Sequence, residues 1–342
     1  MQRLLLIGFG NVGRALARIL LEQHRYPGLA SLNVAVVGVT TATRGALASV
    51  AGVDLATALA EIELNGRFGP TTPGFVELDS MRAIETLDYD VLVELSTLSV
   101  ANRGEPALSH VRNALTRGKD VITCNKGPLA WSYRELADLA AARGCRLLHE
   151  GTVMDGVPVF NLTRHGLRGN VVTGIEGVLN STTNVVLCAL ERGETLADAV
   201  RRAQDAGIAE ADPANDLLGW DAAVKLTVLA NVLMDAELTP EAVAREAVTA
   251  ATGVRARAAL AEGLRLKALC TAEREGSLVR ASVALRELAP DHPFAHLQGA
   301  GSALRISTDI LGTFVLAEEA PDLNTTAYAV ISDLFALAEP LS

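Results

Sequence analysis

Hydrophobic and polar positions divide the first half of the chain into short apolar runs separated by segments with helical spacing. The stretch 3–23, RLLLIGFGNVGRALARILLEQ, opens with such a run, which is typical of a buried parallel strand. The segment after it repeats apolar residues at the helical period, namely Ala15, Leu16, Ile19 and Leu20. Further strand-like runs alternate with helical segments, at 33–39, 90–96 and 120–124. This alternation predicts an α/β fold with a Rossmann-type, doubly wound parallel sheet.

The pattern changes in the second half of the chain. Glycines and a proline interrupt the apolar pieces of 147–160, which indicates a crossover between domains. The region 170–187 is predicted as strands that end in a polar turn at 180–184, and alternating runs at 278–285 and 303–310 add strands without intervening helices. We therefore expect a second α+β domain with a mixed sheet. The last segment, 325–339, has the pattern of an amphipathic helix capped by Thr325 or Thr326, and it is expected to return to the first domain.

Composition narrows the function classes. The chain has 342 residues, of which 49% are hydrophobic and 20% charged, as in globular proteins that bury a large core. A net charge of −10 argues against a nucleic-acid partner or an acidic membrane surface. Four cysteines without CxxC spacing favour a reducing, cytoplasmic setting. The chain starts directly with a strand pattern and has no apolar run of about 20 residues, so we expect neither a signal peptide nor a membrane span.

A glycine-rich turn, Gly8–Gly13, joins the first strand to the first helix. In the pattern GxGxxG, the glycines allow a tight turn, a close approach of the backbone to a pyrophosphate, and close packing of helix on strand. The helix N-terminus offers free N–H groups to phosphates. A structural glycine turn is the alternative. The sequence favours dinucleotide binding through the turn residues Gly8, Gly10, Asn11, Val12 and Gly13.

The end of the second strand bears on the choice of cofactor. NAD-binding sites usually carry Asp or Glu there to hold the ribose 2′-hydroxyl, yet no acidic residue occurs before Asp54. Thr40, with the residues of the TTATRG stretch up to Arg44, could receive a 2′-phosphate instead. We therefore expect NADP, with NAD as the alternative. Ligands bind beyond the carboxyl ends of parallel strands, so the cofactor edge should also include Ser96, Thr97, Asn125 and Lys126.

A second cluster of candidate chemistry lies at 209–226, AEADPANDLLGWDAAVKL. Asp221 and Lys225 are spaced i, i+4 and share a helix face, and the helix is apolar nearly all round, which predicts burial. A buried ammonium needs partners, and Asp221 is one. Such a lysine can give a proton to an oxygen that gains negative charge. The carboxylates of Glu210 and Asp216 suit the α-ammonium of a substrate. An ordinary exposed ion pair is the alternative.

Together these motifs resemble the homoserine dehydrogenase family, in its short form without a C-terminal regulatory domain. The resemblance covers nearly the whole chain and rests on six stretches: GFGNVG at 8–13, VELST at 93–97, TCNKGPLA at 123–130, EGTVMDGVP at 150–158, GVLNSTTN at 177–184 and AEADPANDLLGWDAAVK at 209–225. It implies reversible, NAD(P)H-dependent reduction of L-aspartate 4-semialdehyde to L-homoserine in the biosynthesis of threonine, methionine and isoleucine. It also implies a homodimer formed through the second domain.

The resemblance assigns roles to individual residues. Substrate would be bound by five side chains, those of Glu210, Asp216, Thr182, Asp221 and Lys225. Lys126 would contact substrate beside the nicotinamide, which Thr97 would position. A monovalent cation, usually sodium in the family, would be bound by Glu150, Val153, Asp155 and Val157. Oxygen ligands suit such a hard cation, whereas a turn of carbonyls without an ion is the alternative.

The domain ranges follow from these assignments. We expect a dinucleotide-binding domain at 1–149 with 311–342, and a substrate-binding and dimerisation domain at 150–310. The chain departs from the family in having Ser181 in place of a common glycine, Asn215 in place of a frequent acidic residue, and no glycine at 315–327. Two alternatives remain: a nucleotide sensor of the same fold with impaired catalysis, and a semialdehyde dehydrogenase that uses Cys124 as nucleophile.

Overall fold

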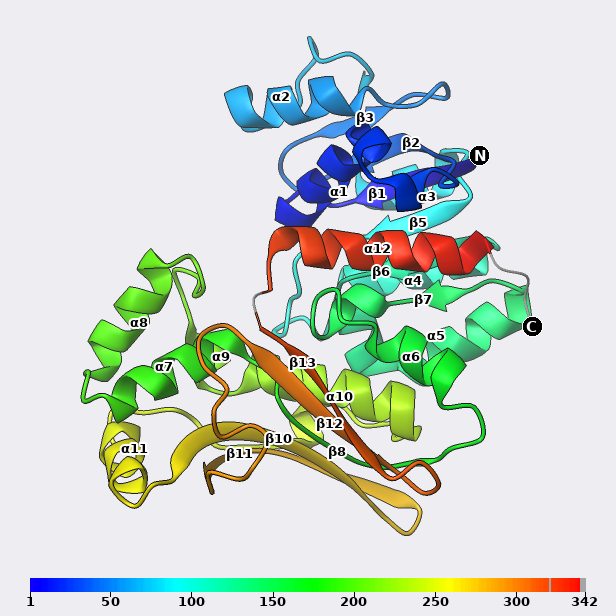
Figure 1. The fold of residues 1–342 in the computed structure, drawn as a ribbon. Helices are drawn as coiled ribbons and strands as arrows, with labels where there is room; N and C mark the ends of the chain where they lie inside the picture. The colour runs from blue at the N-terminus through cyan, green and yellow to red at the C-terminus, as the bar shows by residue number, and fades with distance from the viewer. Residues whose placement is uncertain (320, 339–342) are drawn as a thin grey trace. The chain divides into compact units, whose positions relative to one another are not determined.

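The computed structural model describes residues 1–319 and 321–338, and these form two compact units (Figure 1). The first unit comprises Met1–Pro158 and the described residues from Asp322 onward, and the second comprises Val159–Pro321. These ranges differ from those expected from sequence, since 150–158 belongs to the first unit and 311–321 to the second. The second unit is thus an insertion into the chain of the first.

The first unit contains a seven-stranded sheet in the order β4-β3-β2-β1-β5-β6-β7. The pairs β2–β1, β1–β5, β5–β6 and β6–β7 are parallel, whereas β3 and β4 extend one edge of the sheet with antiparallel pairs. The strands are β1 (Gln2–Ile7), β2 (Val34–Thr40), β3 (Ala46–Ala48), β4 (Phe75–Val76), β5 (Val91–Glu94), β6 (Asp120–Thr123) and β7 (Leu147–Leu148). The predicted Rossmann-type sheet is confirmed. Strand order turns back at β1, between β2 and β5, where such folds bind nucleotides.

Helices cover both faces of this sheet. Leu4 and Leu6 of β1 join a core with α1, α2 and α12, while Leu5 and Ile7 join a second core with α3, α4 and α5. Successive side chains of a strand point to opposite faces, so an apolar run is needed when both faces are covered. The helices are α1 (Asn11–Leu21), α2 (Leu55–Asn65), α3 (Ser80–Thr86), α4 (Ala107–Thr116), α5 (Gly127–Arg143) and α12 (Leu323–Ala338), with short 3₁₀ turns η1 (Gln23–Arg25), η2 (Pro27–Leu29) and η3 (Glu150–Thr152).

The final helix returns to the first unit, as the sequence predicts, but its start differs from the prediction. It begins at Leu323, and the carboxylate of Asp322 accepts hydrogen bonds from the backbone N–H groups of Asn324 and Thr325 at 2.8 Å each. Thr325 and Thr326 therefore lie inside the first turn, and predicting either of them as the cap was wrong. Residue 339, the predicted helix end, lies outside the described residues.

The second unit contains a six-stranded sheet in the order β13-β12-β8-β10-β11-β9. Its pairs are antiparallel except β9 with β11, so the predicted mixed sheet is confirmed. The strands are β8 (Val172–Val178), β9 (Ala244–Arg245), β10 (Arg265–Glu275), β11 (Leu278–Leu288), β12 (Ser302–Thr308) and β13 (Thr313–Glu318). Strands β8, β11 and β12 were predicted from the sequence pattern, whereas β9, β10 and β13 were not.

Helices α7, α10 and α11 pack against β10 of this sheet (Figure 1). The helical elements of the unit are α6 (Val159–Gly166), α7 (Ser181–Glu191), α8 (Leu196–Asp205), α9 (Ala214–Leu217), α10 (Trp220–Met234), α11 (Thr252–Ala261) and the 3₁₀ turn η4 (Pro240–Ala242). The predicted polar turn at 180–184 is wrong, because these residues cap and begin α7. Burial of one helix face in the core outweighs the weak helix preference of its threonines.

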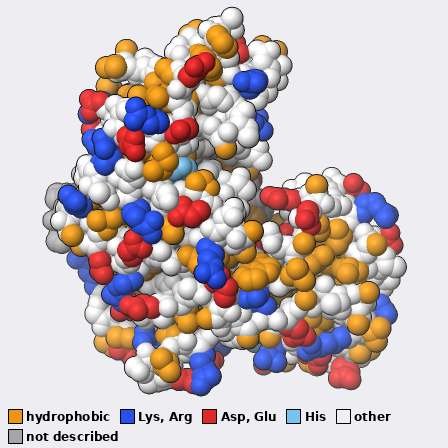
Figure 2. Space-filling model, turned by 180° about the vertical axis from the view of Figure 1, so that it is seen from behind, with side chains coloured by type: hydrophobic (Ala, Val, Ile, Leu, Met, Phe, Trp, Pro, Cys, Tyr) orange, Lys and Arg blue, Asp and Glu red, His pale blue; other side chains and the backbone are white. Residues whose placement is uncertain are grey.

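The surface is charged with both signs. Figure 2 shows Lys and Arg side chains interspersed with Asp and Glu over the visible face. Among the described residues, no helix is long and apolar enough to cross a membrane.

Candidate active site

The glycine turn in the first unit has the geometry of a phosphate-binding loop. Gly8 has φ +102°, and a Cβ there would lie 2.7 Å from the backbone carbonyl of Leu95. A Cβ at Gly13 would lie 2.9 Å from the carbonyl oxygen of Gly8, whereas one at Gly10 would meet no atom within 4 Å. Gly8 therefore makes the tight turn, Gly13 brings α1 onto β1, and Gly10 leaves open space for a ligand. These are the three roles that a dinucleotide pyrophosphate requires.

The start of α1 adds donors to this turn. The helix begins at Asn11 without an acidic residue in its first turn, and its first N–H groups suit an anion. Arg14, which the sequence analysis missed, donates to Asn11 Oδ1 at 2.7 Å and to the Gly10 carbonyl at 3.3 Å. Its position directly after the last glycine of the motif was the available signal. Val12 is half-buried against the core of this unit, so its contribution to a cofactor site is through its backbone.

The end of β2 limits which residues could reach a 2′-phosphate. Thr40 is 1% exposed, and its hydroxyl shares a 2.9 Å hydrogen bond with that of Ser80. The hydroxyl of Thr41 accepts from the backbone N–H of Arg44 at 2.8 Å and donates to the Gly45 carbonyl at 2.9 Å, which shapes the loop. The exposed Arg44 is therefore the charged group of this loop, and Thr40 is a buried neighbour.

Two loops meet beyond the carboxyl ends of β5 and β6. The buried amide of Asn125 donates to the Ser96 carbonyl at 2.9 Å and accepts from the Gly127 N–H at 2.9 Å. Lys126, which lies between Asn125 and Gly127 in the chain, directly precedes α5 and is half-buried. Thr97, next to Ser96, is exposed. The structure thus brings the predicted Ser96 and Lys126 loops together within the first unit.

A buried carboxylate stabilises the first of these loops. Glu94, which is 0% exposed, accepts from the Ser96 N–H at 2.8 Å and pairs with His110 Nδ1 of α4 at 2.8 Å. Neither residue was predicted as part of the site.

Cys124, the candidate nucleophile of the alternative reaction, follows β6. Burial, with the carboxylates of Asp333 and Asp155 nearby, raises the pKa of this thiol and makes it a poor nucleophile.

The segment 150–157, predicted to bind a cation, is buried at 150–154 and half-buried at 155–157, and its backbone has an uncommon conformation. Glu150 is 1% exposed, and its backbone N–H donates to Asp333 of α12 at 2.9 Å. Met154 and Asp155 have φ +61° and +47°, a conformation that non-glycine residues adopt rarely. The hydroxyl of Thr326 donates to Asp155 Oδ1 at 2.7 Å. Among the described residues, no cluster of three His, Cys, Asp or Glu side chains could bind a metal, so a cation here would need backbone carbonyl oxygens in addition to the Glu150 carboxylate.

Three of the predicted substrate residues form a cluster in the second unit. Lys225 Nζ lies 3.1 Å from Asp221 Oδ2 and donates to the Leu179 carbonyl at 2.8 Å. The side chains of Lys225 and Asp221 are only 20% and 19% exposed, so the pair is not an ordinary surface ion pair. The amide of Asn180 donates to Asp221 Oδ2 at 2.9 Å and to Asp216 Oδ1 at 2.7 Å. Asn180 thus joins Asp216 to the pair, and the sequence analysis missed it.

The electrostatics of this cluster make Asp216 harder to ionise than a free carboxyl group. Burial and the charge of Asp221 raise the pKa of Asp216, while hydrogen bonds from Asn180 and Thr182 and the charge of Lys225 lower it. Burial also raises the pKa of Cys270, a neighbour on β10, to about 12, so this thiol stays neutral. A cationic group of a ligand would lower the pKa of Asp216 and favour its charged form.

The remaining predicted residues lie around the cluster. Thr182 is 5% exposed in the first turn of α7 and donates to the Ile208 carbonyl at 3.2 Å. Glu210 is exposed, and Gln204 binds its backbone carbonyl at 3.1 Å. The structure therefore does not bring the Glu210 carboxylate into the buried cluster. Asp212 accepts from the Ala214 N–H at 3.0 Å and so stabilises the turn before α9.

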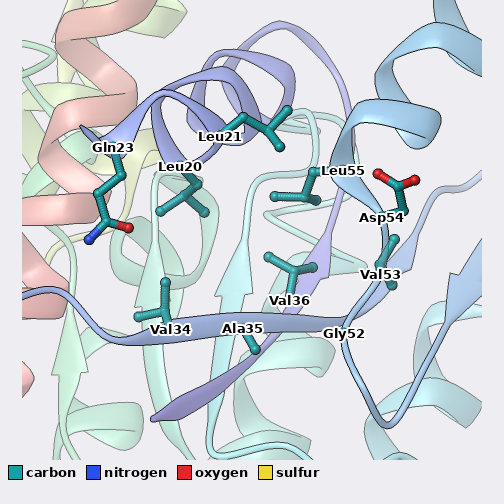
Figure 3. A pocket seen from close by; sticks show the side chains of 10 residues that line it. All are labelled: Leu20, Leu21, Gln23, Val34, Ala35, Val36, Gly52, Val53, Asp54 and Leu55. Carbon is teal, nitrogen blue, oxygen red and sulfur yellow. The ribbon is translucent and has the colours of Figure 1, made fainter. Parts of the chain in front are cut away.

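A cavity of about 280 Å³ lies elsewhere in the first unit (Figure 3). Its lining comes from the end of α1, the first half of β2 and the loop before α2, and consists of Leu20, Leu21, Gln23, Val34, Ala35, Val36, Gly52, Val53, Asp54 and Leu55. Because residues 34–36 begin the strand, this cavity lies at the opposite end of β2 from Thr40 and Arg44. It is mainly apolar and separate from the nucleotide turn.

Comparisons with known proteins agree with this geometry. A family model described as homoserine dehydrogenase matches residues 158–335, and one described as the NAD-binding domain of homoserine dehydrogenase matches residues 8–150. The chain belongs to the homoserine dehydrogenase family. The resemblance read from its motifs is confirmed.

Individual homoserine dehydrogenases match over nearly their whole length. The NAD(+)-dependent homoserine dehydrogenase of Pseudomonas canavaninivorans is 36% identical over 335 residues, which are 97% of this chain and 95% of that one. A putative homoserine dehydrogenase of Archaeoglobus fulgidus has a similar structure, with a TM-score of 0.85, 28% identity, and coverage of 98% and 99% of the two chains. A hyperthermophilic archaeal homoserine dehydrogenase in complex with NADPH matches with a TM-score of 0.82, 29% identity, and coverage of 99% and 98%.

Proposed function

We propose that this chain catalyses the reversible NAD(P)H-dependent reduction of L-aspartate 4-semialdehyde to L-homoserine. One observation carries the proposal: a largely buried ammonium, Lys225, is ion-paired to Asp221 at 3.1 Å in a protein of the homoserine dehydrogenase family. The glycine turn of the first unit fits a dinucleotide, which supplies hydride to the aldehyde carbon when bound.

The residues of the cluster have complementary tasks. Hydride addition leaves negative charge on the aldehyde oxygen, and Lys225 gives that oxygen a proton while Asp221 keeps the amine oriented. Asp216 binds the α-ammonium of the substrate, assisted by Thr182 at the start of α7, whereas the exposed Glu210 lies outside this cluster. Lys126, at the start of α5, stabilises the developing charge beside the nicotinamide that Thr97 positions.

The test is the oxidation of NADPH, followed at 340 nm, with aspartate semialdehyde as substrate. We expect turnover by the wild type, a fall of at least about a hundredfold in Lys225→Ala, as for loss of a general acid, and an NADPH Kd close to wild type. Lys119→Ala is the matched control, since Lys119 lies over the Tyr89 ring in the first unit. Wild-type protein that binds NADPH but does not reduce the semialdehyde would contradict the proposal and favour the sensor alternative.

The preferred cofactor is NADP in this proposal. Support comes from the exposed Arg44 in the loop after β2 and from the lack of an acidic residue between the end of β2 and Asp54. We expect Arg44→Ala to lower kcat/KM for NADPH by about tenfold while kcat/KM for NADH, the control in the same variant, changes little. Equal losses for both cofactors, or a wild-type preference for NADH, would contradict it.

A monovalent cation, with sodium as the expected ion, binds the 150–157 segment in this proposal. The buried carboxylate of Glu150 would supply the charge, and the backbone carbonyls of Val153, Asp155 and Val157 the other oxygen ligands. We expect the Tm of the wild type to be higher in NaCl than in choline chloride at equal ionic strength. The difference should vanish in Glu150→Gln. An equal Tm in both salts would leave this segment as a structural turn.

The second unit is the expected site of homodimer formation. The β12–β13 hairpin carries exposed apolar side chains, with Ile310 at 75% and Leu311 at 59% exposure. Light scattering on the purified chain tests this: a dimer mass is expected, and Leu311→Asp should shift it toward the monomer if the hairpin takes part. A monomer at all concentrations would exclude the dimer.

A further inference from the structure

The side chain of Asn180 makes contacts in two directions. As the N-cap of α7, its Oδ1 accepts from the backbone N–H of Thr183 at 2.7 Å. Its Nδ2 donates to Asp216 Oδ1 at 2.7 Å and to Asp221 Oδ2 at 2.9 Å. An asparagine amide has one acceptor oxygen and two N–H donors. Because the helix cap engages the oxygen, both donors are directed at the two carboxylates.

The two carboxylates come from different helices, Asp216 from α9 and Asp221 from α10. Like charges brought together in a partly buried site repel and favour protonation of one of them. Asp221 Oδ2 also receives Lys225 at 3.1 Å, so one oxygen binds both the amide and the ammonium. The N–H donors of Asn180 therefore offset the repulsion between Asp216 and Asp221. They also fix the rotamer of Asp221, on which the position of Lys225 depends.

We propose that Asn180 is a positioning residue of the active site, which keeps Asp216 and Asp221 together and thereby orients Lys225. The inference rests on the proposed function, which assigns substrate binding to the carboxylates and proton transfer to the lysine. Asn180 itself touches neither substrate nor cofactor in this role; it acts through Asp216 and Asp221.

A simple helix cap is the competing explanation, and the two roles need different chemistry. A cap needs only an acceptor, so Ser or Asp at this position would serve nearly as well. Only an amide also supplies two N–H donors. Asn180→Ser keeps an acceptor and removes the donors, whereas Asn180→Asp keeps an acceptor of the same size and adds a third carboxylate.

The charged and titratable groups around Asp216 are few in the described structure. Asp221 and Lys225 face it from α10, and Cys270 of β10 lies beside that pair with its thiol neutral. The bond from Asn180 lowers the pKa of Asp216, so loss of the bond should raise that pKa. The acid limb of a pH–rate profile reports such a group.

The experiment compares kcat, KM and the pH profile for aspartate semialdehyde in the wild type, Asn180→Ser and Asn180→Asp. We expect kcat/KM to fall about tenfold or more in Asn180→Ser, as for loss of hydrogen bonds to charged groups, with the acid limb at higher pH. The limb should move further in Asn180→Asp, and the NADPH Kd should stay at the wild-type value. If Asn180→Ser does not fold, the shift of the acid limb in Asn180→Asp tests the positioning role by itself.

Thr195→Ala is the matched control, because Thr195 caps α8 in the same unit by accepting from the Asp198 N–H at 3.2 Å. It should weaken a cap without moving the pH profile. A wild-type acid limb and kcat/KM in folded Asn180→Ser would overturn the proposal and leave Asn180 as a cap. ¹³C NMR titration of the Asp216 carboxylate in Asn180→Ser needs no substrate. An unchanged titration refutes the positioning role even if the wild type proves inactive, which separates this failure from failure of the proposed function.

Discussion

The glycine turn allows cofactor binding and protein stability to be separated by two single substitutions. At Gly10, φ is −78° and an added Cβ would meet no atom within 4 Å, so alanine fits the fold. At Gly8, φ is +102° and a Cβ would lie 2.7 Å from the backbone of Leu95. Gly10→Ala should therefore affect the ligand, and Gly8→Ala the fold.

The magnitudes follow from these geometries. Alanine at a compatible position stabilises a protein by about 0.4–1 kcal/mol because it restricts the unfolded chain. The methyl group at Gly10 would occupy the space where a pyrophosphate approaches the backbone, and we expect NADPH affinity to fall at least tenfold, about 1.4 kcal/mol. At Gly8, backbone strain of about 1–3 kcal/mol adds to overpacking of about 1–3 kcal/mol, for a loss of about 2–6 kcal/mol.

Two measurements test this pair. NADPH Kd comes from fluorescence titration, and the free energy of unfolding comes from urea denaturation. Gly10→Ala should be as stable as the wild type or slightly more stable, with weakened binding, whereas Gly8→Ala should be strongly destabilised. Folded Gly10→Ala that binds NADPH with the wild-type Kd would refute the assignment of this turn to the pyrophosphate.

Three further predictions concern other parts of the two units. Asp216→Asn should become more stable relative to the wild type as pH rises above 3.8. The raised pKa of Asp216 means that this carboxyl ionises more readily in the unfolded chain than in the folded one, so the wild type loses stability. Urea denaturation from about pH 4 to 7 measures the difference in unfolding free energy, and a difference that stays constant contradicts the prediction. Lys267→Met should cost about 1–3 kcal/mol of unfolding free energy, since the fully buried Lys267 donates to Asn184 Oδ1 at 2.9 Å and to the Leu297 carbonyl; a neutral effect would mean that these acceptors find other partners. Cys124→Ser should keep wild-type turnover in the semialdehyde assay, and loss of turnover together with a phosphate requirement would revive the nucleophile alternative.

The first unit could be predicted because its signals are local. A strand, a glycine turn and a helix follow one another within residues 2–21, and the apolar runs identify the buried strands β2, β5 and β6. The strand β10 was missed because its pattern includes Lys267, which reads as a surface residue. Only the fold provides the Asn184 and Leu297 partners that allow this lysine to be buried.

The candidate site was predicted unevenly for a similar reason. The i, i+4 spacing of Asp221 and Lys225 on one helix revealed their ion pair. Asn180 lies 36 and 41 positions before its two carboxylate partners, and no short-range pattern reports such a contact. The exposure of Glu210 and the burial of Thr40 likewise depend on how neighbouring elements pack rather than on the residues themselves.

The insertion of the second unit has a consequence for synthesis of the chain. Helix α12 contributes four fully buried side chains to the core around α1, those of Ala327, Val330, Ile331 and Leu334. During translation, the inserted unit is complete before this helix leaves the ribosome. One face of the sheet of the nucleotide-binding unit therefore stays partly uncovered until α12 has been synthesised, and truncation of the chain before Leu323 would remove these core side chains.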